Sequence, residues 1–312
     1  MHNLLRYIRM NKSKLIKVAL IVAFLIIILQ VLNYISGNKN NIEFSNDSSN
    51  IQKETNGTIK SDKSAVSGTK VSESVIKEVG NIINTFVDYC NSEEIDKAYE
   101  LLSQECKDIL YNNLDSFRET YYNRIFNNRN RTYTIENWTG NTYMVKFTED
   151  LLSTGKAINN SSYTDYITII DENGEKKLNI NSLIGIKEIN KEKTENDIKV
   201  KVLNSKKYME YEEYEIEVTN YTNSTILLDT LSDSKGIYIK DNKDNRHYAY
   251  KNELSKEDMK VFSKNSKKFK IKFDNPYITG RNIKTLCISN IVLNYVEENY
   301  GASFKAKVSV DI

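Results

Sequence analysis

The feature that most constrains this chain is an apolar stretch at residues 15–35, LIKVALIVAFLIIILQVLNYI, in which no residue from Val18 to Leu29 is polar. About 20 apolar residues, each rising about 1.5 Å, are enough to cross a bilayer core as a helix. We therefore expect a basic cytoplasmic tail at residues 1–14, a transmembrane helix at 15–35, and folded domains after it.

The charges on either side of the stretch predict its orientation. Residues 1–17 carry five basic and no acidic side chains, whereas residues 36–50 carry one lysine and two acidic residues. Positive flanks stay in the cytoplasm, so we expect the N-terminus inside and the C-terminal domains outside the cell. A cleaved signal peptide is the alternative. It would have a shorter apolar core and an A-x-A site, which residues 31–37 lack.

A polar segment follows at residues 36–70, rich in Asn, Ser, Lys, Gly and Thr. Such a segment buries too little apolar surface to offset its chain entropy, so we expect a flexible linker. As a coil of about 5–6 Å × √n it would reach about 30 Å. That part of it packs on a domain is the alternative.

Hydrophobic periodicity changes after residue 71. Apolar side chains recur at intervals of three and four along 75–90, and the same spacing returns in 95–102 and 106–114, which predicts a series of amphipathic helices. Ser116 and Glu119 have the spacing of a capping box, so helix is expected to restart there.

Beyond residue 130 the period becomes two. Alternating runs at 133–136, 143–147 and 165–169 predict strands, and Asn173-Gly174 between two such runs predicts a tight hairpin. Helices followed by a strand meander predict an α+β domain over residues 71–187, with helices on one face of a curved antiparallel sheet.

This order of elements resembles the NTF2-like domains, cystatin-like α+β cones found outside the membrane in many low-GC Gram-positive proteins. The resemblance rests on four segments: the opening helix to Cys90, KAYELLS at 97–103, SFRETYYNRIF at 116–126 and the closing hairpin ENGEKKLNI at 172–180. It implies a cone used for ligand binding, occasionally for catalysis, and often for packing against partner proteins.

The C-terminal part has a different pattern. A dense charged segment at 188–197 predicts a linker, and short alternating runs from 198 to 312 predict an antiparallel β-sandwich. The phrase YEIEVTNYTNSTILL at 214–228 is similar to paired strands of immunoglobulin-like domains in bacterial surface proteins. A small barrel is the alternative.

The sequence contains no motif for nucleotide binding or hydrolysis, and we expect no cofactor and no metal. Net charge is +2 with mixed signs throughout, which argues against a nucleic-acid partner. Asp241, Asp244 and Asn245 lie as close together in the sequence as the ligands of a calcium-binding loop, but the neighbouring basic residues favour a solvated turn. The same holds for Asp229 and Asp233.

Two residue types that often carry chemistry are scarce. The histidines are His2 and His247, so a histidine base or metal cluster is not expected. The cysteines, Cys90, Cys106 and Cys287, are expected to be small buried hydrophobes, with a Cys90–Cys106 disulfide as the alternative.

Three residues are candidates for a ligand site in the first domain: Trp138, Tyr166 and Asp165. Trp138 and Tyr166 are out of phase with the apolar residues of their strands, so they could line one surface together. For Trp138 the alternative is packing at the rim of the domain, or in its core if a bulge at Asn137 shifts the phase. Asp165 is in phase with Ile167 and Ile169, and a carboxylate on that face, like Asp88 on the first helix, is the only type of acid–base group available there. Solvation at a sheet edge is the alternative for both carboxylates.

These features predict a non-enzymatic, single-pass membrane protein that displays binding or assembly domains outside the cell, with the membrane and other envelope proteins as partners. An accessory part of a cell-envelope or conjugation machine is one specific version. The alternative is a small-ligand-binding or enzymatic cone. A deep cavity lined by the three candidates would favour it, and a cone filled by Phe86, Tyr143, Val145 and Phe147 would exclude it.

Overall fold

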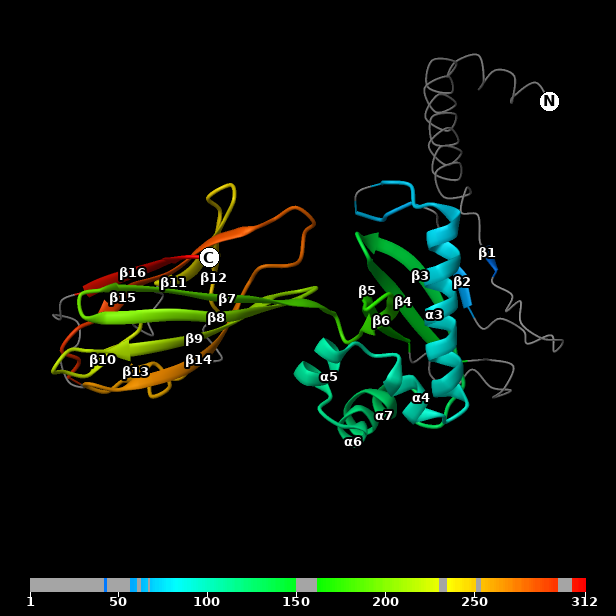
Figure 1. Cartoon of the computed structure of the whole chain (residues 1–312), viewed down its shortest axis with the longest axis horizontal. Coiled ribbons are helices and arrows are strands. Elements are labelled where there is room, and N and C mark those ends of the chain that lie inside the picture. Colours follow the sequence, from blue (N-terminus) through cyan, green and yellow to red (C-terminus); the bar gives the residue numbers. More distant parts are fainter. Residues whose placement is uncertain are drawn as a thin grey trace, which may run out of the picture. The chain divides into compact units, whose positions relative to one another are not determined.

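The computed structural model of the chain describes residues 42–43, 57–60, 63–66, 68–149, 162–229, 235–250, 254–296 and 305–312 (Figure 1). Residues Glu43–Ile312 form one compact unit. The expected basic tail at 1–14, the apolar stretch at 15–35 and most of the expected linker at 36–70 lie outside the described residues.

The described helices lie between residues 73 and 125. The longest is α3 (Glu73–Asn91), which begins where the Ser72 hydroxyl accepts a hydrogen bond from the backbone N–H of Val75. The others are short: α4 (Ile95–Glu100), α5 (Gln104–Leu110), α6 (Leu114–Phe117), the π-helix η1 (Arg118–Tyr122) and α7 (Asn123–Ile125).

The capping box in this region starts three residues earlier than expected. Asn113, not Ser116, is the N-cap of α6, and its side chain accepts from the backbone N–H of Ser116 at 2.8 Å. The Ser116 side chain in turn accepts from the backbone N–H of Asn113. Asparagine is as good an N-cap as serine, so a search for Ser-x-x-Glu alone missed it.

The helices accompany a first sheet of strand order β1-β2-β3-β4-β5-β6. Its strands are β1 (Ile42–Glu43), β2 (Gly57–Ile59), β3 (Arg131–Thr139), β4 (Thr142–Glu149), β5 (Tyr163–Glu172) and β6 (Glu175–Asn179). Strand β2 runs parallel to β3, and β3 to β6 are antiparallel. Ile83 and Phe86 of the apolar stripe of α3 are fully buried, and α3 lies beside this sheet (Figure 1).

The rest of the chain forms two sheets that share one core. One has the order β14-β9-β8-β7, from β7 (Leu183–Glu195), β8 (Ile198–Tyr208), β9 (Glu212–Asn220) and β14 (Ser266–Phe273). The other has the order β12-β11-β15-β10-β13, with β16 paired to β15. Its strands are β10 (Ile226–Leu227), β11 (Ile237–Asp241), β12 (Arg246–Tyr248), β13 (Lys260–Val261), β15 (Ile283–Val292) and β16 (Lys305–Asp311). Both sheets contribute alternate apolar side chains to the shared core, for example Val200 of β8 and Leu286 of β15.

The charged segment expected to be a linker at 188–197 is mostly strand. Residues 188–195 belong to β7, which pairs with β8 as far as Glu195 opposite Ile198. Strand β7 is an edge strand of its sheet, and most of its side chains are exposed. An exposed edge strand carries charge instead of an apolar alternation, which explains why the sequence pattern indicated a linker.

The expected α+β fold class is wrong. Strands make up 48% and helices 20% of the structure, so it is mostly β instead of an NTF2-like cone of helices and sheet with a separate immunoglobulin-like sandwich. The physical reason lies in the helical region, where turns repeatedly interrupt the apolar stripe. At Glu93 φ is +60°, and Ser103 and Asn113 each cap a new short helix instead of extending the one before.

The expected location as a single-pass membrane protein with extracellular domains is also corrected. Within the ranges that the structure describes, no helix combines the length and apolarity needed to cross a bilayer. The stretch at 15–35, on which that expectation rested, falls outside those ranges.

Candidate functional site

Two of the three predicted site residues lie together. The rings of Trp138 in β3 and Tyr166 in β5 are 5.3 Å apart between centroids and inclined by 63°, an edge-to-face pair. Both side chains are half-buried. Strand alternation places them on the sheet face opposite the buried side chains of Tyr133 and Ile135, as the sequence predicted.

The third predicted residue, Asp165, lies on the other face. Its carboxylate is buried and accepts three hydrogen bonds from within the fold. The Tyr121 hydroxyl donates to Oδ2 at 2.8 Å, and the backbone N–H groups of Asn181 and Ser182 donate to Oδ2 and Oδ1 at 2.9 Å each.

Burial raises the pKa of the Asp165 carboxyl, and these hydrogen bonds oppose the rise. The group is therefore satisfied by the protein itself and offers no free acceptor to a substrate. The other carboxylate considered, that of Asp88, accepts from the Asn84 amide at 3.1 Å.

The interior between helices and first sheet is filled by side chains. Phe86, Val145 and Phe147 are fully buried, and Tyr143 is nearly so. Buried aromatic rings pack in sequence there: Phe117 stacks on Tyr121 at 5.7 Å, and Phe126 meets Phe147 edge-on at 5.6 Å. These side chains occupy the space between the helices and the first sheet.

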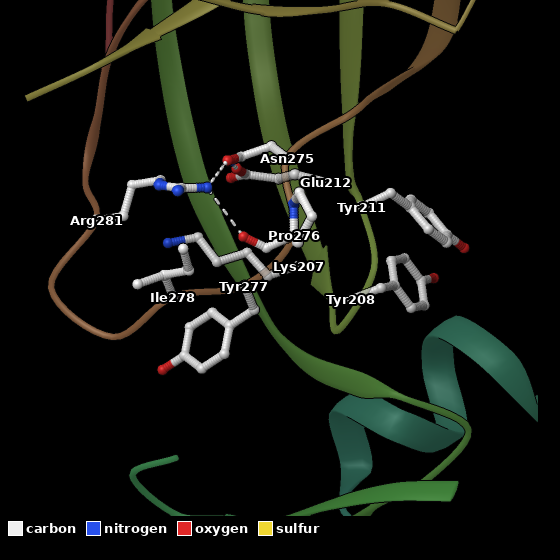
Figure 2. A pocket seen from close by; sticks show the side chains of 9 residues that line it. All are labelled: Lys207, Tyr208, Tyr211, Glu212, Asn275, Pro276, Tyr277, Ile278 and Arg281. Atoms are coloured by element: carbon white, nitrogen blue, oxygen red, sulfur yellow. Dashed lines mark hydrogen bonds between the residues drawn. The ribbon is translucent and has the colours of Figure 1, made fainter. Parts of the chain in front are cut away.

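A shallow surface hollow occurs instead at one end of the two-sheet unit (Figure 2). It forms where the β8–β9 turn meets the loop between β14 and β15. The residues that line it are Lys207, Tyr208, Tyr211, Glu212, Asn275, Pro276, Tyr277, Ile278 and Arg281.

A buried polar frame supports the hollow. Glu212 is only 3% exposed, and its carboxylate accepts from the Tyr214 hydroxyl at 2.9 Å and from the Asn275 amide at 2.7 Å. The amide oxygen of Asn275 accepts from Nη1 of Arg281 at 2.7 Å, and the Pro276 carbonyl accepts from the same nitrogen at 3.1 Å (Figure 2). The frame therefore fixes the Arg281 side chain at the hollow.

The turn and the loop are joined at the backbone as well. The N–H of Tyr208 donates to the Tyr211 carbonyl at 2.9 Å, which closes the β8–β9 turn. The N–H of Tyr277 donates to the Met209 carbonyl at 3.0 Å, which ties the loop to that turn. The rings of Tyr208 and Tyr211 stack at 4.5 Å beside the hollow, so its floor and walls are preformed.

The residues considered for metal binding do not form a site. The Asp241 carboxylate accepts from the backbone N–H groups of Lys243 and Asn245, at 2.8 and 2.9 Å, and from the Asn245 amide at 3.0 Å. These hydrogen bonds hold the pKa of the Asp241 carboxyl well below its usual range. Nε of Arg281 lies 3.9 Å from the same carboxylate, so a guanidinium already faces it.

The remaining acidic residues and the cysteines also show no arrangement typical of a functional site within the part of the chain that the structure describes. Among the described residues, no group of three or more His, Cys, Asp and Glu side chains is placed to hold a metal ion. Asp229 is buried, and Asp233 lies outside the described ranges. Cys90, Cys106 and Cys287 are buried free thiols, so the alternative Cys90–Cys106 disulfide does not form.

Sequence reasoning missed the hollow because its two halves are some 65 positions apart in the chain. The signal that could have indicated it is local: the pair Tyr208 and Tyr211 around a turn, and Pro276 at the start of a loop with Tyr277 and Ile278 behind it. Neither segment contains a local sequence signal that predicts their contact in the fold.

Comparison with known protein families, with curated proteins and with solved structures found no match. The resemblances to NTF2-like and immunoglobulin-like domains stay predictions without support from known proteins.

Proposed function

We propose that this chain is a non-catalytic binding module that assembles with another protein through the hollow at the end of its two-sheet unit. The observation that supports the proposal is the hollow itself, which is preformed and lined by both aromatic and charged side chains. Aromatic residues and arginine are the residue types enriched where proteins bind proteins.

The size of the hollow favours a protein partner over a small molecule. Pockets for small ligands are clefts or cavities that enclose most of the ligand, whereas this hollow is shallow and encloses very little space. A partner would therefore contact its rim instead of filling it. Ile278, 45% exposed, is an apolar rim residue available for such a contact.

The interior of the first sheet argues against the alternative of an enzymatic or ligand-binding cone. Phe86 and Phe147 are buried in the space between the helices and the sheet. The Asp165 carboxylate accepts hydrogen bonds from Tyr121, Asn181 and Ser182 instead of facing a ligand. The more specific prediction, that the partner belongs to a cell-envelope or conjugation machine, stays untested.

Site-specific photo-crosslinking tests the proposal. A benzophenone amino acid replaces Ile278 at the hollow, and in a matched variant it replaces Phe262, which is 61% exposed but does not line the hollow. In the cells that make the protein, we expect a discrete crosslinked adduct from position 278 and none from position 262. Absence of an adduct from position 278, or identical adducts from both positions, would contradict the proposal.

A further inference from the structure

We infer that the hollow binds an acidic segment of the partner protein, whose carboxylates pair with Lys207 and Arg281. The inference deepens the proposed function and rests on it.

Lys207 carries a charge without a counter-charge. It lies on β8 opposite Glu212 of β9, which is the acidic residue among those lining the hollow. The Glu212 carboxylate, however, is buried and already accepts from Tyr214 and Asn275. Within the described ranges, no ion pair or hydrogen bond involves the Lys207 ammonium. A carboxylate brought into the hollow would therefore be its first partner.

Arg281 is the second cation at the hollow, and it is held in place. Its Nη1 donates to Asn275 and Pro276, and its Nε lies 3.9 Å from Oδ2 of Asp241. That carboxylate is shared among the Lys243 and Asn245 donors of its own turn, so it only partly offsets the guanidinium. A guanidinium has five N–H donors, and a fixed one loses little entropy on binding a second acceptor.

The hollow therefore pairs two cations with an apolar rim. Lys207 and Arg281 approach it from different segments, and Pro276, Tyr277 and Ile278 complete its wall (Figure 2). The complementary ligand is a short segment with at least two Asp or Glu side chains next to an apolar one. Charge complementarity of this kind sets specificity and association rate.

The charge pattern also argues against nucleic acid as the occupant. A nucleic-acid surface needs a basic stripe that follows the phosphate backbone. Beside the hollow, Glu213, Glu215 and Glu217 of β9 lie opposite lysines of the two neighbouring strands, and Glu213 is 3.7 Å from Lys206. This surface is mixed in sign, so it gives a long polyanion no continuous basic track.

Fluorescence anisotropy with a fluorescein-labelled hexaglutamate peptide tests the inference, with the full chain at low salt so that screening is weak. Hexaglutamine is the uncharged control peptide, and hexathymidine is the nucleic-acid control. The variants are Lys207→Gln, Arg281→Gln and Arg281→Lys, with Lys268→Gln on the exposed part of β14 as the matched control. Lys207→Gln removes the charge of a half-buried side chain and keeps much of its length, so its effect reports mainly on that charge.

We expect hexaglutamate to bind and hexaglutamine not to bind. Charge-assisted hydrogen bonds lead us to expect that Lys207→Gln and Arg281→Gln each weaken hexaglutamate binding about tenfold or more, while Arg281→Lys weakens it less and Lys268→Gln leaves it unchanged.

Three results would overturn the inference: no binding of hexaglutamate, equal binding by Lys207→Gln and the unchanged protein, or equally tight binding of hexathymidine. If crosslinking from position 278 still yields a specific adduct, the proposed function stands and only the acidic partner is wrong.

Discussion

The hydroxyl of Tyr121 in η1 donates a 2.8 Å hydrogen bond to Oδ2 of Asp165 in β5, and both side chains are buried. The same carboxylate binds the backbone N–H groups of Asn181 and Ser182. These two residues have φ angles of +57° and +63°, in the left-handed region that few non-glycine residues adopt. Asp165 therefore stabilises a turn that the backbone alone would not favour.

Replacing Asp165 with asparagine should destabilise the fold. The amide keeps the shape of the carboxylate but turns one acceptor into a donor, which leaves a buried N–H or O–H group unsatisfied. We expect the free energy of unfolding in urea to fall by about 1–3 kcal/mol. Tyr121→Phe, which removes a single hydroxyl from the same cluster, should cost about 1 kcal/mol. Equal stability of Asp165→Asn and the unchanged protein would show that the cluster is not structural.

The turn at Asp241 should make stability depend on pH. Its hydrogen bonds lower the pKa of the folded carboxyl, so they stabilise the fold above the unfolded pKa of about 3.9 and are lost as pH falls below that value. Compared by urea unfolding, Asp241→Asn should be less stable than the unchanged protein at neutral pH, and the difference should shrink below about pH 4. A difference that is constant over this range would contradict the prediction.

The pair of Trp138 and Tyr166 can be followed by fluorescence, because Trp138 is the only tryptophan in the chain. Tyr166→Ala removes the ring that packs edge-on against the indole, so tryptophan emission should move to longer wavelength. Loss of the ring pair should also lower stability by about 1 kcal/mol. Tyr221→Ala, at an exposed tyrosine elsewhere, is the control and should leave the emission unchanged. An unshifted spectrum for Tyr166→Ala would show that the tyrosine does not shield Trp138.

Gly57 lets strand β2 lie against the ring of Tyr133. A Cβ at position 57 would overlap that ring, and the Tyr133 hydroxyl is held by a 3.0 Å hydrogen bond to Asn84. We expect Gly57→Ala to lower the free energy of unfolding by about 1–3 kcal/mol. Combining it with Tyr133→Leu should cost less than the sum of the two single changes. Strict additivity in this double-mutant cycle would mean that the two positions do not clash.

Local signals in the sequence predicted individual elements well. The long helix expected up to Cys90 is α3 (Glu73–Asn91), and the hairpin expected at Asn173-Gly174 joins β5 to β6 with both turn residues at positive φ. Each of these elements depends on a spacing of a few residues, which can be recognised from the sequence alone. The edge-to-face contact of Trp138 with Tyr166 also follows from strand alternation.

Contacts between segments that are distant in the sequence could not be predicted in the same way. Asp165 was expected to line a ligand site, but its carboxylate is used by a turn at Asn181 and Ser182 that the pattern did not indicate. The hollow depends on the backbone hydrogen bond from Tyr277 to Met209. The fold class depends on where turns interrupt the apolar stripes of the helical region. These features are decided by tertiary contacts between segments, for which a single sequence has no local signal.

The charged edge strand β7 has a consequence for how copies of this protein behave at high concentration. Its free edge could in principle recruit a strand from another molecule and begin a fibril. Most side chains along that edge are exposed and many are charged, and the irregularity between Glu188 and Lys191 interrupts the regular ladder that strand addition needs. We therefore expect strand β7 to resist strand addition by another copy of the chain.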